Sequence, residues 1–331
     1  MAKAVIIDYT YLGGEELFTP ERQACAESGI DLELRSCKTE DEIIEAAHDA
    51  DAVLCCGNPP ITRKVIEALP QCRAYIRYGI GVNSVDLDAA TEHGKLVYFM
   101  PGFCAEELVL HATALVLNLL RNVCFYDREI RAGKWPKAKG ALPRRLTNMT
   151  VGLYGFGASA RPMAKVFGHG FGSRVIACDP YLPDSVFEEA GVARVSFDEL
   201  LAQADIVSIH APLTAENRHI FNMDAFRKMK NTAMIINIAR GPLIDEADLI
   251  EALKTGEIRY AGLDTHEHEP LLPGDPLLEL ENVVVTPHSA FYGEESLHTQ
   301  HVTAARLTVS TLKDHEIVQS NLANRKVLEK L

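Results

Sequence analysis

The chain is short of positive charge: its 331 residues include 33 Lys and Arg against 46 Asp and Glu, a formal net charge of −13. Nucleic acids and anionic membrane surfaces are bound through clusters of basic residues, so we expect neither as the main partner. A small anionic substrate remains compatible with this composition, because it needs only one local cationic pocket. The apolar content of 47% is ordinary for a globular protein, and the length predicts about two domains.

Long apolar runs and paired cysteines are also missing. No apolar stretch approaches the roughly 18–20 residues that span a bilayer, and the opening MAKAVIIDYT has the pattern of a short strand, not of a signal peptide. The cysteines form no CxxC pair and have no ligand spacing with histidines, which favours reduced thiols over a zinc or disulfide framework. They lie at positions 25, 37, 55, 56, 72, 104, 124 and 178. We therefore expect a cytoplasmic protein that requires no metal.

Short strand-like runs alternate with amphipathic helical patterns along most of the chain. A first set of runs covers residues 4–8, 31–35, 52–56, 74–79 and 95–99, and a second set covers residues 150–155, 174–179, 205–210, 234–239, 260–264 and 283–288. Nearly continuous apolar runs are typical of strands that helices cover on both faces. The expected fold class is therefore α/β, with two Rossmann-like, doubly wound parallel sheets.

The chain is expected to cross between two domains twice. A long apolar helical pattern at 105–122 follows Pro101-Gly102, a pair that can act as a hinge. The second crossing is expected near residue 290, because the helical pattern at about 294–314 has no strand left to pair with a sheet. The predicted segments are a first domain at 1–100, a second domain at 101–289, and a C-terminal helical segment at 290–331.

A glycine-rich turn marks the second half of the chain. Gly155-Phe156-Gly157-Ala158-Ser159-Ala160 reads GxGxxA between a predicted strand and a helical pattern, and the next strand ends on Asp179, 24 residues after Gly155. Glycines let the backbone approach a pyrophosphate, and the acid binds the ribose hydroxyls of the adenosine. A sharp turn, with Asp179 as a cap before Pro180, is the alternative. The context predicts a dinucleotide site, and NAD over NADP because an acid repels a 2′-phosphate.

Three polar side chains follow predicted strands of the second set: Arg240 after MIINIA, Glu269 shortly after YAGLD, and His288 at the end of VVVTPH. Ligands of open parallel sheets bind at the carboxyl ends of the strands. Singly, each has an ordinary explanation: a solvated arginine, an exposed acidic turn shared with Glu267, or a histidine that caps a strand. Together they supply the anion anchor, the orienting acid and the proton donor that carbonyl reduction by a nicotinamide needs.

The chain resembles the D-isomer-specific 2-hydroxyacid dehydrogenase family over nearly its full length. The motifs that carry the resemblance are VGLYGFGASA with Asp179, HAPLT (210–214), NIARGPLID (237–245), AGLDTHEHEP (261–270) and TPHSAFYGEES (286–296). The resemblance implies that residues 101–289 form an NAD-binding Rossmann domain, inserted into a substrate (catalytic) domain made of residues 1–100 and the returning C-terminal helix at 290–331. It also implies a homodimer, and it implies that Arg240, Glu269 and His288 are the catalytic residues.

Further contacts follow from the same resemblance. The backbone amides of Ala158 and Ser159 would hold the pyrophosphate, and Asp264 would bind the nicotinamide carboxamide. The other residues implied to bind the cofactor NAD are Gly155, Gly157, Asp179, His210, Pro212, Ile238, Ala239, Arg240 and His288. The substrate carboxylate would be held by Arg240 and by the loop that contains Tyr78, Gly79 and Ile80, for which a simple glycine turn after a strand is the alternative.

Several positions depart from the family pattern. Asn83-Ser84-Val85-Asp86 replaces the usual Asp-Asn-Ile-Asp, VYFMPG lacks the usual asparagine, and Leu110 precedes His111 where the family often has an acid. Ala158 and Ala160 replace a basic residue and a glycine. These changes leave the three catalytic positions intact, but they bear on loop geometry and on the choice of substrate.

Subgroups of the family are separated by a few features. Formate dehydrogenases have glutamine where Glu269 lies, and 331 residues leave no room for the regulatory domain of the longer phosphoglycerate dehydrogenases. The stretches FCAEEL (103–108) and HSAFYGEES are also similar to the C-terminal-binding corepressors. An NAD-sensing binding protein is therefore the alternative to a metabolic reductase, although the intact set of catalytic residues favours the enzyme.

The expected reaction is reversible hydride transfer between NAD(H) and the C2 atom of a 2-oxo acid or an (R)-2-hydroxy acid, as in glyoxylate, hydroxypyruvate or other 2-oxoacid reductases. Arg240 would hold the carboxylate and polarise the C2 oxygen, His288 would exchange the proton, and Glu269 would orient the ring and stabilise its charged form. Candidate walls for the substrate side chain are Tyr9, Tyr11, Leu12, Asn58, Tyr78 and Phe291. The basic loop 131–145 is compatible with a solvated arm and with a subunit contact.

Overall fold

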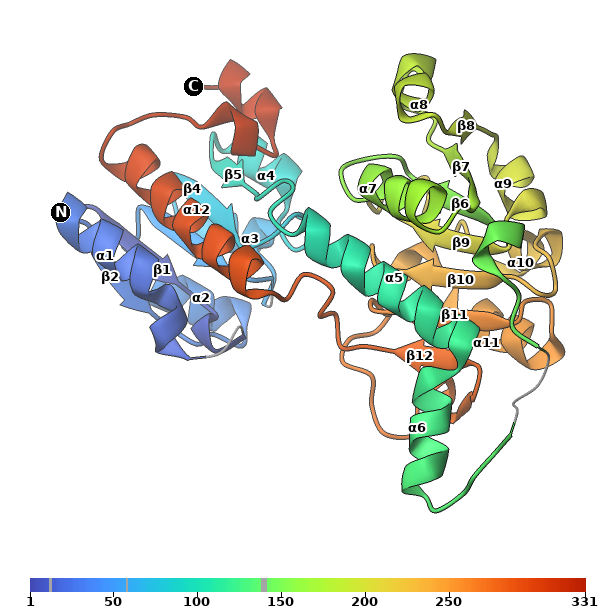
Figure 1. Ribbon diagram of the computed structural model, residues 1–331. Coiled ribbons are helices and arrows are strands. Elements are labelled where there is room, and N and C mark those ends of the chain that lie inside the picture. The colour runs from blue at the N-terminus through green and yellow to red at the C-terminus, as the bar shows by residue number, and fades with distance from the viewer. Residues whose placement is uncertain (12–13, 58, 138–141) are drawn as a thin grey trace. The chain divides into compact units, whose positions relative to one another are not determined.

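The structure of the protein is a computed structural model that describes residues 1–11, 14–57, 59–137 and 142–331. The chain forms two units (Figure 1). Unit 1 consists of Met1–Phe103 and Gly293–Leu331, and unit 2 is the intervening segment Cys104–Tyr292.

Unit 1 is built on a five-stranded parallel sheet with the order β2-β1-β3-β4-β5. Its strands are β1 (Lys3–Ile6), β2 (Asp31–Leu34), β3 (Ala52–Cys55), β4 (Ala74–Arg77) and β5 (Leu96–Tyr98). Its α-helices are α1 (Thr19–Ser28), α2 (Glu40–Ala46), α3 (Arg63–Ala68), α4 (Leu87–Glu92) and α12 (Glu294–Leu312). Short 3-10 turns cover Tyr9–Tyr11, Glu15–Phe18, Gln319–Asn321 and Arg325–Glu329.

Both faces of the unit 1 sheet are buried. Successive side chains of a strand point to opposite faces, so Ala4 and Ile6 of β1 pack in one core with α1 and α12, while Val5 packs in the other core with α2, α3 and α4. The helices α1 and α12 lie side by side over the same face (Figure 1). This double coverage explains why the first set of strand-like runs is mostly apolar, apart from the run at 31–35, whose strand β2 lies at the edge of the sheet.

Unit 2 contains a seven-stranded sheet with the order β12-β11-β10-β9-β6-β7-β8, again parallel throughout. Its strands are β6 (Thr150–Tyr154), β7 (Arg174–Cys178), β8 (Ala193–Arg194), β9 (Ile206–Ile209), β10 (Met234–Asn237), β11 (Tyr260–Leu263) and β12 (Val283–Val285). Its α-helices are α5 (Ala105–Arg121), α6 (Val123–Arg131), α7 (Ala160–Lys165), α8 (Asp184–Ala190), α9 (Phe197–Gln203), α10 (Met223–Lys228) and α11 (Glu246–Thr255). A π-helical turn at Val166–Gly170 extends α7, and 3-10 turns cover Leu146–Asn148, Gly241–Leu243 and Pro276–Glu279.

The strand order of unit 2 reverses at β6, whose neighbours are β7 on one side and β9 on the other. Helices α5, α7 and α8 pack on one face of the sheet, and α9, α10 and α11 pack on the other. In such doubly wound sheets, the crevice for a ligand opens at the carboxyl ends of the two strands on either side of the reversal. The α/β class with two parallel sheets, predicted from the alternation of runs, is confirmed.

Two elements were not predicted from the sequence. Strand β8 has only two residues, both exposed, so it leaves no apolar run. Helix α6 follows α5 after Asn122, which adopts a left-handed conformation, and none of its residues is buried. Among the described residues, no single helix is long and apolar enough to cross a membrane, whereas α5 and α6 meet that test only when taken together across a bend of 63°.

Candidate active site

The glycine-rich turn directly follows β6, at the reversal of strand order. Gly155 has a φ of +86°, and a Cβ atom there would lie 2.6 Å from the backbone nitrogen of Ala211 beyond β9. Only glycine therefore allows the two strand ends to approach so closely. Around Gly157, by contrast, the position of a Cβ atom is open, so the backbone is accessible on that side. Ala158 and Ser159 follow at once and lead into α7.

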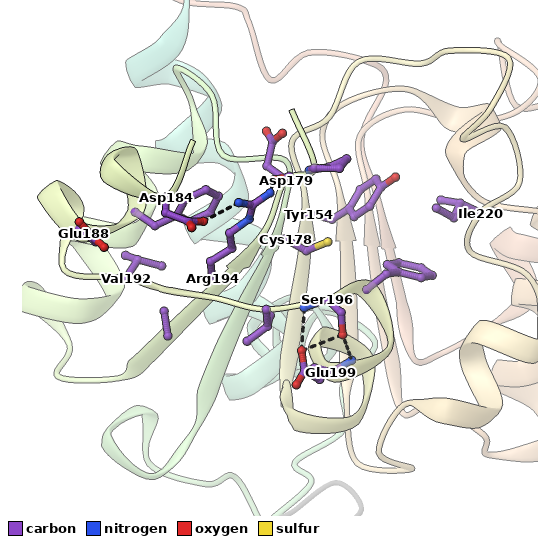
Figure 2. Close-up of a pocket in the computed structure, with 15 residues that line it drawn as sticks. Tyr154, Cys178, Asp179, Asp184, Glu188, Val192, Arg194, Ser196, Glu199 and Ile220 are labelled. Carbon is purple, nitrogen blue, oxygen red and sulfur yellow. Dashed lines mark hydrogen bonds and ion pairs between the residues drawn. The ribbon is translucent and has the colours of Figure 1, made fainter. Parts of the chain in front are cut away.

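Asp179 lies one residue beyond β7 and is joined to the glycine-rich turn. Its Oδ2 accepts a hydrogen bond from the backbone N–H of Phe156 at 2.9 Å, and its Oδ1 accepts one from the backbone N–H of Tyr181 at 3.0 Å. A carboxylate oxygen can accept two hydrogen bonds, so each oxygen can accept one more from a ribose hydroxyl. Asp179 lines an open cavity of about 810 Å3, and Figure 2 shows it among the other side chains that line this cavity. The residues that line the cavity include Tyr154, Cys178, Asp179, Arg194, Phe197 and Ile220.

His210, just after β9, connects that strand to the same turn. Its Nδ1 lies 3.0 Å from the Ser159 hydroxyl, and its Nε2 lies 3.0 Å from the Ser208 hydroxyl. Burial lowers the pKa of His210 to about 3, so the ring is neutral in the physiological range. Its role is thus to fix the position of Ser159, and Pro212 follows it in the same segment. The open backbone at Gly157, the spare acceptor capacity of Asp179 and the adjoining cavity together fit a bound dinucleotide.

Glu269 and His288 form a hydrogen-bonded pair in unit 2. Glu269 Oε2 lies 2.8 Å from His288 Nδ1, and Glu269 Oε1 accepts from the backbone N–H of His266 at 2.9 Å. A carboxylate only accepts hydrogen bonds, so Nδ1 of His288 is the donor and Nε2 is left for another partner. Both side chains are partly exposed, at 28% for His288 and 35% for Glu269. The sequence-predicted acid and imidazole are therefore in direct contact.

The electrostatics of the pair favour an ionised Glu269. Burial of this carboxyl group raises its pKa, but the hydrogen bond and charge of His288 and the amide of His266 act in the opposite direction and hold the pKa of Glu269 below its usual range. The carboxylate is then available to stabilise a positively charged ring on His288.

Glu267, the other acid of the same segment, has different partners. Its Oε1 lies 2.6 Å from Nε2 of His219 and 3.3 Å from a guanidinium nitrogen of Arg218. Its backbone N–H donates to Glu246 Oε2 at 3.2 Å. The Glu-x-Glu spacing left open which acid contacts His288, and the geometry favours Glu269.

Arg240 lies three residues beyond the end of β10. The side chain of Asn237 fixes this turn, because its Oδ1 accepts from the backbone N–H of Ala239 at 3.0 Å and its Nδ2 donates to the Arg240 carbonyl at 2.9 Å. A guanidinium nitrogen of Arg240 donates to the Ala239 carbonyl at 2.6 Å. A Cβ atom on Gly241 would lie 1.9 Å from the His266 carbonyl, so glycine is needed for this turn to pack against the segment that leads to Glu269.

Asn237 was not among the predicted site residues, although its place at the end of a buried strand is a usable signal. The nearby Ile238, predicted to lie by the nicotinamide, is 5% exposed. Asp264, at the end of β11, is fully buried and accepts hydrogen bonds from its own chain, including the N–H of Ser289 at 2.8 Å and that of Ala290 at 2.9 Å. Its predicted contact with the carboxamide remains a prediction.

The predicted substrate loop belongs to unit 1, at the end of β4. The Tyr78 side chain is only 2% exposed, and its hydroxyl donates to Glu21 Oε1 at 2.8 Å. The expectation that this side chain lines the substrate pocket is therefore corrected, and the backbone N–H of Tyr78 is also engaged, since it donates to the Cys55 carbonyl at 2.8 Å. Gly79 has a φ of +136° and its carbonyl accepts from the N–H of Met100 at 2.9 Å, while the side chain of Ile80 is 39% exposed.

The other candidate wall residues are only partly described. Phe291 lies edge-on to His288, with ring centroids 6.5 Å apart, and Tyr9 is partly buried in unit 1. Leu12 and Asn58 lie outside the described residues, as does the side chain of Tyr11. In the described part of the chain, no group of three or more His, Cys, Asp or Glu is arranged to hold a metal ion.

The chain is similar to several known proteins. The model of the family "D-isomer specific 2-hydroxyacid dehydrogenase, NAD binding domain" matches residues 113–290. A glyoxylate reductase from Korarchaeum cryptofilum is 35% identical over 87% of this chain and 86% of its own length. A D-3-phosphoglycerate dehydrogenase from Archaeoglobus fulgidus is 35% identical over 80% of this chain, which spans 50% of that protein.

A solved structure shows the same fold over the full length of the chain. The crystal structure of a glyoxylate reductase from Paecilomyes thermophila has a TM-score of 0.87 and 27% identity, and the match covers 98% of this chain and 99% of that one. The chain therefore belongs to the D-isomer specific 2-hydroxyacid dehydrogenase family, and it is an NAD-dependent oxidoreductase of that family.

Proposed function

We propose that the protein reduces a small 2-oxo acid to the (R)-2-hydroxy acid with NADH, and catalyses the reverse oxidation with NAD. The single observation that carries the proposal is the 2.8 Å contact between Glu269 and His288, which leaves Nε2 of the imidazole for a substrate oxygen. The relatives named as glyoxylate reductases support a short substrate such as glyoxylate or hydroxypyruvate.

Arg240, His288 and Glu269 have different tasks in the proposed reaction. Arg240 binds the substrate carboxylate and polarises the C2 oxygen through charge-assisted hydrogen bonds. His288 donates a proton from Nε2 to that oxygen during reduction and takes it back during oxidation. Glu269 holds the ring by Nδ1 and stabilises its positive charge. The loop at Gly79 and Ile80 of unit 1, which the family resemblance implies as a further binder of the carboxylate, stays a prediction.

The cofactor site divides between the glycine-rich turn and the acid beyond β7. Bound NADH supplies the hydride for C2 of the substrate. The backbone amides of Ala158 and Ser159 would bind the pyrophosphate beside the open backbone at Gly157, with His210 holding Ser159 in place. Asp179 binds the ribose hydroxyls and repels a 2′-phosphate, so NADH is preferred to NADPH.

An NADH-oxidation screen tests the proposal. The purified full chain is mixed with NADH and a panel of 2-oxo acids that includes glyoxylate, hydroxypyruvate, pyruvate and a branched 2-oxo acid, and absorbance at 340 nm is followed. At least one short 2-oxo acid should be turned over with kcat/KM on the order of 10⁴ M⁻¹s⁻¹ or higher. An NAD-sensing binding protein, the alternative function, would bind NADH in the same sample and turn over none of the panel.

We also propose that the protein is a homodimer that joins through unit 2. Large apolar side chains are exposed on α5, on α6 and in the segments that follow α6. Their exposed fractions are 61% for Leu110, 56% for Val123, 50% for Ile130, 81% for Trp135 and 83% for Leu142. Exposed apolar surface of this kind is typical of a protein contact, which favours a subunit contact over a solvated arm. Sedimentation analysis should show a dimer, and Ile130→Glu with Trp135→Glu should make it a monomer.

A cytoplasmic location belongs to the same proposal. None of the eight cysteines, all within the described residues, takes part in a disulfide, and seven are buried. Reduced thiols in this number fit a reducing compartment. Cell fractionation with an antibody against the chain should place it with cytoplasmic markers.

A further inference from the structure

Asp264 is the centre of a hydrogen-bond network beneath the turn that carries His288. The carboxylate is fully buried. Its Oδ1 accepts from the Thr286 hydroxyl at 2.6 Å and from the backbone N–H of Ser289 at 2.8 Å, and its Oδ2 accepts from the N–H of Ala290 at 2.9 Å. A buried carboxylate is costly unless donors surround it. The segment 286–290 therefore folds around this side chain.

His288 lies in the middle of this segment in an unusual conformation. Its φ is +54°, in the left-handed region that residues with a side chain rarely adopt, and its backbone N–H donates to the Asp264 carbonyl at 2.8 Å. Such a conformation persists only where the surroundings hold it in place. The backbone of His288 is thus held by Asp264, while its ring is held separately by Glu269 at 2.8 Å.

Helix α5 contributes one further member, His111. Its Nε2 lies 2.9 Å from the Thr286 Oγ1 and 3.4 Å from Asp264 Oδ1. The Thr286 hydroxyl has a single hydrogen, and the contact of 2.6 Å with a carboxylate directs it to Asp264. The hydroxyl oxygen therefore accepts, and Nε2 of His111 must carry a hydrogen. The order of donors is His111 to Thr286 to Asp264.

We propose that His111 is a positioning residue, which holds the turn of His288 in its reactive orientation through Thr286 and Asp264. The inference rests on the proposed function, in which His288 exchanges the proton. Without a donor on His111, the Thr286 hydroxyl is free to rotate away from Asp264, and the turn loses one of its supports. A displacement of about 1 Å at a reacting group can lower a rate roughly a hundredfold. His111 therefore acts on turnover, not on cofactor binding.

The test compares His111→Leu, which removes the donor, with His111→Gln, whose amide nitrogen can replace Nε2. Glu106→Gln, at an exposed position of the same helix, is the matched control. His111→Leu should lower kcat by roughly ten- to a hundredfold, with KM and the NADH dissociation constant within about threefold of the wild type. His111→Gln should recover most of kcat. Equal losses in both variants, or losses matched by lost NADH binding, would show a general structural role and overturn the proposal.

A second readout separates this inference from the proposed function. The ring protons of His288 are assigned in NMR spectra by their loss in His288→Ala, in the enzyme without substrate. In His111→Leu the His288 signal should shift or broaden, while in His111→Gln it should return to its wild-type position. An unchanged signal in His111→Leu would refute the positioning role even if turnover fell. If no 2-oxo acid were turned over by the wild type, the proposed function would fail, and the NMR result would still decide whether His111 holds the turn.

Discussion

In both units, carboxylates follow the carboxyl ends of strands in a parallel sheet. In unit 1 the carboxylate is buried, whereas in unit 2 two carboxylates remain partly exposed. In unit 1, Asp8 lies beyond β1, is 4% exposed, and accepts from the backbone N–H groups of Cys56 at 2.7 Å and Gly57 at 3.2 Å. In unit 2, Asp179 borders an open cavity and Glu269 is 35% exposed. Asp8 therefore stabilises the local backbone of unit 1, whereas Asp179 and Glu269 are accessible to ligands.

Their titration follows from this difference. Burial raises the pKa of Asp8 to about 6, although the two amides that it accepts from act in the opposite direction. For Glu269 the balance is reversed, because His288 and the His266 amide outweigh burial and hold its pKa below the usual range. Glu269 therefore keeps its charge, because a basic partner and some solvent lie beside it. Asp8, which has a structural role, can lose its charge more easily.

The largest expected effect comes from unit 2. His288→Ala should lower kcat for 2-oxo-acid reduction on the order of a thousandfold, because the proton donor is removed. His219→Ala is the matched control, since His219 also pairs with a glutamate, at 2.6 Å from Glu267. It should stay within about threefold of the wild type. Steady-state kinetics and NADH fluorescence titration measure both variants, and NADH binding should survive in each. Equal losses of kcat in His288→Ala and His219→Ala would contradict the assignment of the proton donor to the Glu269–His288 pair.

A smaller effect is expected from the acid at the open cavity. Asp179→Ser should narrow the preference for NADH over NADPH by roughly ten- to a hundredfold, because the charge that repels the 2′-phosphate and binds the ribose is lost. The control is Asp198→Ser, an exposed acid of α9 that pairs with Lys228 at 2.8 Å. The measured quantity is the ratio of kcat/KM for the two cofactors. A wild-type enzyme that uses NADPH as well as NADH would contradict the role of Asp179.

In unit 1 the expected effect is on stability. The pKa of Asp8 is about 6 in the folded chain and 3.8 as a reference value. As the pH rises from 4 to 7.5, the Asp8 carboxyl group ionises at a lower pH in the unfolded chain than in the folded chain. The free energy of unfolding therefore falls by about 2 kcal/mol through this group. Asp8→Asn cannot ionise and should not show this loss. Denaturant unfolding at both pH values measures the difference in free energy of unfolding between the wild type and Asp8→Asn. A difference that does not change with pH would mean that Asp8 is not a buried acid with a raised pKa.

Much of this arrangement could be predicted from the sequence, because apolar runs and glycine spacing report directly on buried parallel strands and a cofactor turn. The α/β class and the family were confirmed in this way. The family resemblance implied Glu269, whereas periodicity and composition do not separate it from Glu267, because two acids two residues apart differ only in which histidine each one meets in space. The burial of Tyr78 was also missed, since a tyrosine after a strand has the same pattern whether its ring points inward or outward.

The roles of Asn237 and His111 were hidden for a related reason. Each acts on a functional residue through hydrogen bonds between segments or within a turn, and nothing in periodicity or composition reports such contacts. Helix α6 escaped prediction because none of its residues is buried, so its amphipathic pattern faces no core.

Glu269, and not Glu267, supports the proton donor His288 in the proposed reaction. The pH dependence of kcat/KM for 2-oxo-acid reduction, measured for Glu269→Gln and Glu267→Gln beside the wild type, tests it most directly. Reduction needs a protonated ring, so activity is present at low pH and lost as the pH rises. Glu269→Gln removes the negative charge that faces the ring, so the alkaline limb should move to lower pH. The limb of Glu267→Gln should coincide with that of the wild type. If the alkaline limb moved in Glu267→Gln and not in Glu269→Gln, Glu267 would be the acid that supports His288.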